Sequence, residues 1–142
     1  MILFTVHGTP TPQGGRGAVP TARGTRLLST GGVGLRDWRT AVSAAAADQA
    51  DLVGCQTVPL EVTLTFRFPM PKSAPRHDRE HGIRYRTRTP DIDKLTRAVL
   101  DSLTAAGLIA DDSLVVALHA SKVDVWQDWT GCTVRIEEAV PL

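Results

Sequence analysis

Two aspartates spaced two apart, Asp91 and Asp93, stand where the chain enters a predicted helix, and a further pair, Asp111 and Asp112, follows that helix. Carboxylate oxygens are ligands that Mg²⁺ prefers, and a bound Mg²⁺ suits chemistry at a phosphate. Six Lys or Arg residues lie between positions 72 and 88, just before the first pair. The region therefore offers acidic ligands for a cation beside cationic groups for a polyanion, which indicates a nuclease.

The start of the helix decides whether the first pair can share an ion. Residues two apart on a continuous helix diverge by about 200°. Pro90 changes this geometry, because an N-cap Asp91 folds over the helix start while Asp93 projects from the first turn, so that both approach one ion. The alternative is that the two acidic residues only cap the helix and complement its dipole.

Asp93, Arg97 and Asp101 recur at intervals of four and therefore share one face of this helix. They form either a surface ladder of ion pairs, each worth about 0.3–0.5 kcal/mol, or a functional face. In the functional case Arg97 faces the phosphate whose metal Asp93 holds and offsets the charge that develops during displacement. The spacing is compatible with both.

Hydrophobic patterns predict the elements that position these residues. The expected elements are a strand over 1–7, a helix over about 35–50, a strand over 58–68, a helix over about 92–106 that stops at Gly107, and strands near 114–125 and 130–137 joined as a hairpin through 127–129. The 142 residues, 42% of them hydrophobic, suit one domain with a genuine core. The order predicts a single α/β (α+β) domain over residues 1–142, with a small mixed β-sheet packed against two main helices.

Two segments, 9–34 and 71–89, are predicted to be flexible basic loops, the second with a short edge strand as an alternative. Their arginines are expected to touch the DNA backbone. For 9–34 a disordered surface loop is an equal alternative, and for 71–89 a solvated arm is the weaker alternative. The full set of expected DNA contacts is Arg16, Arg23, Arg26, Arg76, Arg84, Arg86, Arg88, Lys94 and Lys122.

The net charge of +1 argues against a protein that coats nucleic acid through bulk charge. The two signs are unevenly placed: residues 1–90 carry twelve basic and six acidic side chains, whereas residues 91–142 carry four and nine. A basic surface is therefore expected to border an acidic pocket. Arg outnumbers Lys thirteen to three, which fits bidentate phosphate contacts and equally a GC-rich coding sequence.

Other metal and membrane chemistry is not expected. Cys55 and Cys132 lack a C-x-x-C partner, so neither a zinc site nor a disulfide is predicted. His77 and His81 form H-x-x-x-H without an evident third ligand. No window of about 18 apolar residues is present, and the first residues read as a strand, so we expect a cytoplasmic protein without a membrane partner.

The segment from Asp91 to Val123 resembles the RusA family of Holliday junction resolvases. The matching elements are D-I-D-K-L at 91–95, A-V-L-D-S-L-T-A-A-G at 98–107, L-I-A-D-D at 108–112, and Val115-Val116 with Lys122 after them. The joined pattern of D-x-D, amphipathic helix, glycine, short apolar loop and Asp-Asp is far more specific than D-x-D by itself.

The resemblance implies a Mg²⁺-dependent endonuclease, with Mn²⁺ as a substitute, that acts as a homodimer and cuts four-way DNA junctions symmetrically in DNA recombination or repair. It maps the metal-binding catalytic carboxylates onto Asp91, Asp93 and Asp112. It places Arg97 where the family has an essential basic residue, usually Lys. Because Arg stays protonated, its task here is charge stabilisation or phosphate positioning, and proton abstraction is excluded. A bacterial, phage or prophage source is also implied by resemblance only.

The roles of the remaining acidic residues stay open. Asp111 either contacts the metal ligands, replaces one of them, or is the polar entry to the next strand, and Asp101 is a further candidate neighbour of the ligands. The helix over 92–106 spans about 20 Å, so Asp112 starts far from Asp93. We therefore expect two-fold symmetry to bring Asp112 of one subunit to the carboxylates of the other, with a bent helix or a folded-back turn within one subunit as the alternative.

Three functions remain in competition. The first is a Mg²⁺-dependent endonuclease selective for four-way junctions. The second is a DNA-binding protein without catalysis, and the third is a Mg²⁺-dependent phosphohydrolase of small molecules. The basic segment argues against the third, because a nucleotide needs few cations, and the three aspartates together argue against the second.

Overall fold

The alternating segment expected near 58–68 forms β4 (Leu60–Pro69), the middle strand of a five-stranded sheet. This computed structural model describes residues 1–14, 16–21, 24–29 and 32–142. For the described residues between 16 and 33, it describes the backbone and not the side chains. The elements in chain order are β1 (Ile2–His7), β2 (Arg16–Thr21), β3 (Gly24–Ser29), α1 (Gly32–Val53), β4, α2 (Arg76–His81), β5 (Ile83–Tyr85), α3 (Ile92–Ala105), the 3-10 turn η1 (Asp112–Leu114), β6 (Val115–Val125) and β7 (Gly131–Glu138).

The five-stranded sheet is mixed, as the sequence predicts, with the order β1-β7-β4-β6-β5. β4 and β6 run parallel, and the other neighbours are antiparallel. The predicted hairpin between the last two strands is wrong, because β4 lies between β6 and β7 and pairs with both. Alternate side chains of β4, such as Val62, Leu64 and Phe66, are completely buried, and the central place in the sheet gives this apolar strand the deepest position.

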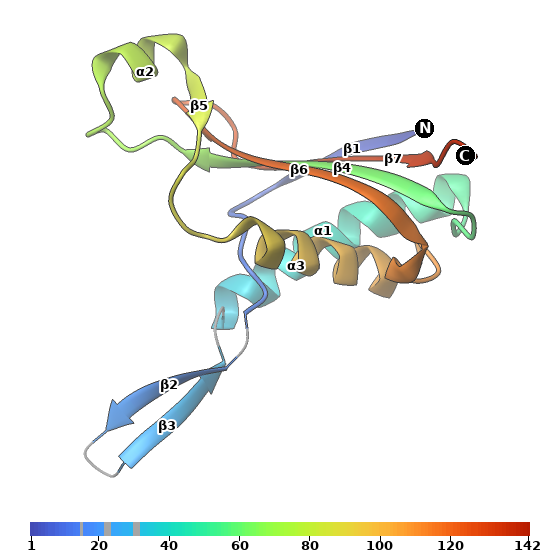
Figure 1. Ribbon diagram of the computed structural model, residues 1–142, viewed down its shortest axis with the longest axis horizontal. Helices are drawn as coiled ribbons and strands as arrows, with labels where there is room; N and C mark the ends of the chain where they lie inside the picture. Colours follow the sequence, from blue (N-terminus) through green and yellow to red (C-terminus); the bar gives the residue numbers. More distant parts are fainter. Residues whose placement is uncertain (15, 22–23, 30–31) are drawn as a thin grey trace.

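Both long helices cover the same face of the sheet (Figure 1). The buried side of α3 consists of Leu95, Ala98, Val99 and Leu103, with Thr96 and Ser102 beside them, and α1 contributes Trp38, Val42 and Ala46 to the same core. Trp38 is 2% exposed, which confirms a core role for it. The layered arrangement leaves the first turn of α3 with an exposed side that is free to act on a substrate.

The end of α3 is set by Gly107, as predicted. Its φ of +76° is a left-handed conformation that favours glycine. The Gly107 amide donates to the Thr104 carbonyl oxygen and the Leu108 amide to that of Leu103, each at 3.1 Å. This pair of bonds is a Schellman motif. It turns the chain away from the helix axis and leads it to the aspartates at 111 and 112.

The two segments predicted as basic loops contain regular structure. Within 9–34 the chain forms an antiparallel β2–β3 hairpin that projects away from the sheet (Figure 1). Neither strand shows a strict polar–apolar alternation and Pro20 interrupts the first, so the pattern gave no strand signal. Within 71–89 the chain forms α2 and then β5, which pairs with β6 at the edge of the sheet and confirms the alternative of a short edge strand.

Neither cysteine is paired, which agrees with the sequence. Cys55 is exposed and Cys132 is buried. Burial raises the pKa of the Cys132 thiol to about 12, so this residue is an inert part of the core.

Candidate active site

Asp91 and Asp93 lie at the first turn of α3, and both are exposed. Asp91 is the N-cap residue, with φ −69° and ψ 138°, and its carbonyl oxygen accepts the Leu95 amide at 3.1 Å. Its carboxylate makes no capping hydrogen bond. The side chain of Asp91 is 61% exposed and faces Lys94, with 3.7 Å between Oδ2 and Nζ. A carboxylate that is not used to cap its own helix is free to hold a ligand.

The surface beside Asp91 is hollowed into an open cavity of about 270 Å³. It is lined by Pro12, Thr89, Pro90, Asp91 and Lys94. The backbone N–H of Gln13 donates to the backbone carbonyl oxygen of Lys94 at 3.0 Å. This bond holds the segment before β2 against the start of α3. Enclosed small-molecule sites usually occupy about 300–1,000 Å³, so this shallow hollow suits a strand of a larger substrate better than an engulfed nucleotide.

Asp112 begins η1, which follows the C-terminal end of α3, whereas Asp91 caps its N-terminal end. The fourteen residues of α3 separate the two ends by about 20 Å at 1.5 Å per residue. Within the part of the chain that the structure describes, no three His, Cys, Asp or Glu side chains are grouped closely enough to hold a metal ion. α3 is one helix from Ile92 to Ala105, and within the described residues of one subunit neither a bent helix nor a folded-back turn brings Asp112 to Asp91 and Asp93.

Asp111 and Asp112 differ in their local contacts. Asp111 caps η1, because its Oδ2 accepts the Ser113 amide at 3.1 Å. The hydrogen bonds from Ser113 lower the pKa of the Asp111 carboxyl. Asp112 is the first residue of η1 and is exposed. Asp111 therefore has a capping task at the entry to β6, which leaves Asp112 as the carboxylate better placed to bind a ligand.

Arg97 is exposed on α3, one turn after Asp93, and Asp101 is half-buried one turn further. The ion pair at this end of α3 joins Lys94 to Asp91. The exposed guanidinium of Arg97 lies on the same helix as the two N-terminal aspartates, close enough along the chain to meet the same phosphate.

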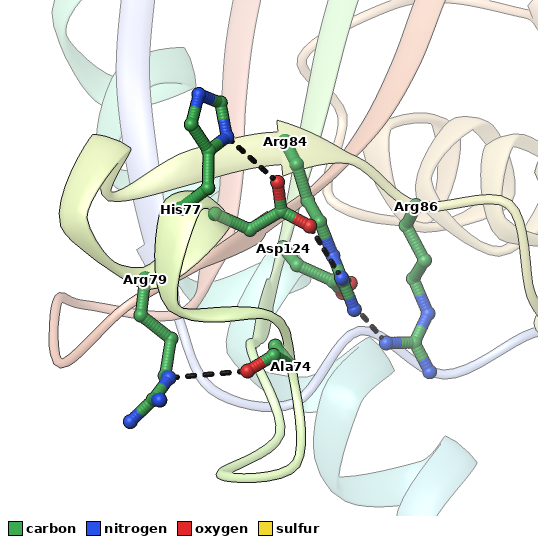
Figure 2. A network of polar contacts seen from close by, with 7 residues as sticks. Ala74, His77, Arg79, Arg84, Arg86 and Asp124 are labelled. Carbon is green, nitrogen blue, oxygen red and sulfur yellow. Dashed lines mark hydrogen bonds and ion pairs between the residues drawn. The ribbon is translucent and has the colours of Figure 1, made fainter.

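Arg84 and Arg86, predicted to touch DNA, lie in a partly buried network around Asp124 of β6 (Figure 2). The side chain of Asp124 is only 1% exposed, and those of the two arginines are 26% and 17% exposed. Its Oδ2 accepts Arg84 Nε at 3.1 Å, and its Oδ1 accepts Arg86 Nη1 at 2.8 Å. Arg84 also donates to Asp78 at 3.0 Å and holds the pKa of that carboxyl below its usual range.

Lys122 is also turned inward. Its Nζ donates to the carbonyl oxygens of Arg88 and Pro90, at 2.6 and 2.8 Å. Arg86 Nε donates to the carbonyl oxygen between them, that of Thr89, at 2.8 Å. Three successive carbonyl groups directly before Asp91 therefore accept hydrogen bonds from cationic side chains.

The other predicted DNA contacts are scattered. Arg88 is exposed beside the network, and Arg76 pairs with Glu80 at 2.7 Å on the exposed surface of α2. Arg16 and Arg26 belong to β2 and β3, and their side chains, like the whole of Arg23, lie outside the described residues.

Sequence reasoning missed Asp124, which the structure places at the centre of the arginine network. The signal was present in part, since Arg84 and Arg86 are spaced two apart and Asp124 interrupts the apolar end of a predicted strand. An acidic residue at a buried strand position calls for a cationic partner.

Comparison with protein families decides between the three competing functions. The profile described as "Endodeoxyribonuclease RusA" matches residues 7–137, nearly the whole chain. The chain belongs to the RusA family. RusA proteins are endodeoxyribonucleases that resolve Holliday junctions, so the chain is a nuclease of this type and acts on branched DNA. A comparison with curated protein sequences gives no match.

As a RusA protein the chain is an enzyme, and the interpretation as a DNA-binding protein without catalysis is set aside. None of the described helices combines the length and the apolar character needed to cross a membrane.

Proposed function

We propose that this protein resolves four-way DNA junctions by Mg²⁺-dependent hydrolysis, as a homodimer in which each metal site draws carboxylates from both subunits. The observation that carries the proposal is the pair of exposed carboxylates, Asp91 and Asp93, at the first turn of α3. The cationic side chains of Lys94 and Arg97 lie on the same exposed turns.

The donor set fits a hard cation. Mg²⁺ is commonly held by one or two protein carboxylates, with waters and substrate phosphate oxygens as the other ligands. Asp91 and Asp93 supply such a pair, and Mn²⁺ takes similar ligands. Asp112 of the partner subunit would complete the set. When bound, the metal polarises the phosphate and lowers the pKa of a bound water.

The chain's own residues have tasks that the geometry suggests. Asp91 and Asp93 hold the cation at the scissile phosphate. Arg97 carries a fixed positive charge that offsets charge on the phosphate oxygens as the bond breaks. Lys94 lies beside the open hollow and suits an adjacent phosphate.

A homodimer follows from the separation of the carboxylates. Asp112 is about a helix length away from Asp91 in its own subunit. A two-fold axis makes any contact between two subunits reciprocal, so Asp112 of each subunit can meet Asp91 and Asp93 of the other. Two such sites related by symmetry match the two symmetric cuts that resolution of a four-way junction requires.

A cleavage assay with three substrates tests the proposal. The protein is incubated with a synthetic four-way junction, with the matched linear duplex, and with a nucleotide, each in Mg²⁺ or in EDTA. Symmetric nicks in the junction that need Mg²⁺ are expected, and binding should weaken steeply with salt as counterions are released. Cleavage that persists in EDTA, or that is equal on the duplex, contradicts the proposal.

A further inference from the structure

The segment that leads into Asp91 is held by side chains rather than by regular secondary structure. Between the end of β5 at Tyr85 and the N-cap Asp91, the chain belongs to no helix or strand. The carbonyl oxygens of Arg88, Thr89 and Pro90 nevertheless all accept charge-assisted hydrogen bonds. Such bonds are shorter and stronger than those between neutral groups.

One of the two donors, Lys122, comes from the central part of the sheet, whereas the other, Arg86, directly follows β5. Lys122 is on β6, which pairs with β4 along its length, and its register partner is Phe66. Its single nitrogen lies between the carbonyl oxygens of Arg88 and Pro90, so that one ammonium group fixes two points of the segment.

Arg86 supplies the third bond and is itself fixed in three ways. Its Nη1 donates to the buried carboxylate of Asp124, and its Nε donates to the Thr89 carbonyl oxygen. Its guanidinium lies over the Phe68 ring, 4.5 Å from the centroid. Figure 2 shows Arg84 and Arg86 both turned toward Asp124. Asp124, together with Asp78 at Arg84, balances the two arginine charges where little solvent reaches them, and it orients the guanidinium of Arg86.

We infer that Lys122, with Arg86 oriented by Asp124, is a positioning device that sets the place of the Asp91 carboxylate. Metal ligands depend on their supporting partners, and loss of such a partner typically costs about 10–100-fold in metal affinity or activity. The inference rests on the proposed function, because it concerns the same metal site. It gives Lys122 and Arg86 a task within the protein rather than at the DNA.

Lys122→Met tests the inference, since it removes the ammonium group and keeps an unbranched side chain. Lys72→Met is the matched control, because it removes an exposed charge outside the network. Calorimetry with Mn²⁺ and no DNA should show a dissociation constant about 10–100-fold higher for Lys122→Met and unchanged for Lys72→Met. Junction binding in Ca²⁺ should stay within about twofold of wild type, as expected for a residue without a phosphate contact.

A metal-free measurement separates local positioning from general damage. The Leu95 amide, which donates to the Asp91 carbonyl oxygen, should exchange its hydrogen faster in Lys122→Met. Amides of the central strand β4 should exchange as in wild type. If Lys122→Met does not fold, Lys122→Arg serves instead, because it keeps the charge while its longer, planar guanidinium changes the position and direction of the donors.

Two outcomes overturn the inference. In one, Lys122→Met binds Mn²⁺ and exchanges the Leu95 amide as wild type does. In the other, it binds Mn²⁺ normally and loses junction affinity, which makes Lys122 a direct DNA contact. Failure of the wild-type protein to bind Mn²⁺ contradicts the proposed function instead, and the Leu95 exchange rate still reports on the positioning role.

Discussion

Asp91 and Asp112 lie at opposite ends of α3, with the fourteen residues of the helix between them. The separation of about 20 Å along the axis prevents the two carboxylates from holding one ion in a single subunit. In the proposed shared site, the same helix would therefore carry one half of a metal site at each end. A dimer in which each subunit's helix start meets the other subunit's η1 would turn these halves into two whole sites.

Asp91→Asn should separate binding from cleavage. The substitution keeps the shape of the side chain and removes the charge that a cation needs. Junction cleavage should fall by more than about 100-fold, beyond the usual loss for a supporting residue. Junction binding in Ca²⁺, measured by gel shift, should remain or tighten slightly, because one negative charge has left the DNA-facing surface. If Asp91→Asn cleaves the junction at a rate within about tenfold of the wild-type rate, Asp91 is not a residue of the active site.

Arg97→Gln should slow the chemical step. Loss of one preorganised donor to a developing charge typically costs about 100-fold or more in rate. Single-turnover cleavage of a pre-bound junction measures this step, and Arg97→Lys should recover most of the rate because it keeps the charge. The control is Arg135→Gln, an exposed arginine on β7 that pairs with Glu137. Equal rates for Arg97→Gln and the control would assign Arg97 to the surface ladder of ion pairs.

Asp124→Asn should destabilise the fold. An amide has one acceptor oxygen, so one of the two arginines would face an NH₂ group in a buried place. We expect a loss of about 2–4 kcal/mol in the free energy of unfolding, below the full cost of a broken buried pair because both guanidinium groups keep some solvent. The control Asp128→Asn alters the pair with Arg67 at a carboxylate that is 61% exposed, so it should cost less than about 1 kcal/mol. Urea denaturation measures the free energy of unfolding of both variants. Equal losses for Asp124→Asn and Asp128→Asn would contradict a structural role of the buried network.

Gly131→Ala should disrupt the pairing of β1 with β7. A Cβ at this position would lie 1.9 Å from the Val6 carbonyl oxygen, and the φ of +143° disfavours any side chain. The expected loss is about 3 kcal/mol or more, because backbone must move. At Gly54 the φ is +77° with open space around it, so Gly54→Ala should cost only about 1–2 kcal/mol. Thermal unfolding measures both losses. A larger loss for Gly54→Ala than for Gly131→Ala would contradict this prediction.

The parts of the fold with strong periodicity could be predicted from the sequence. The central strand, both long helices and the glycine at the end of α3 follow from local patterns that tertiary contacts reinforce. The pairing of β4 with both β6 and β7 could not be predicted, because strand order depends on contacts far apart in the chain. The β2–β3 hairpin lacks alternation and is separate from the five-stranded sheet, so no local pattern marked it.

The candidate site shows a similar division. The aspartates around α3 stand out in the sequence because their types and spacing are unusual, and their separation follows from the rise of a helix. The inward orientation of Lys122, Arg84 and Arg86 could not be predicted. A basic side chain looks the same in sequence whether it faces DNA or a carbonyl oxygen of its own chain. Asp124 on β6 accounts for the orientation of Arg84 and Arg86, and the carbonyl oxygens of Arg88 and Pro90 account for that of Lys122.

A complementation experiment tests the shared metal site most directly. Asp93→Asn and Asp112→Asn proteins, each inactive alone, are mixed under conditions that exchange subunits, and cleavage of a four-way junction is measured in Mg²⁺. In a heterodimer one composite site carries both substitutions and the other carries none. The account predicts that nicking of single strands recovers. With random exchange of subunits, about half of the dimers are heterodimers with one intact site, so about a quarter of all sites should be active.

A matched mixture gives the control for this result. Asp91→Asn and Asp93→Asn alter the same end of α3, so every composite site in their heterodimer carries one substitution, and no activity should return. Recovery in the first mixture and none in the second is the predicted result. No recovered nicking in the first mixture, with subunit exchange verified, would contradict the claim that the two ends of α3 meet across the dimer.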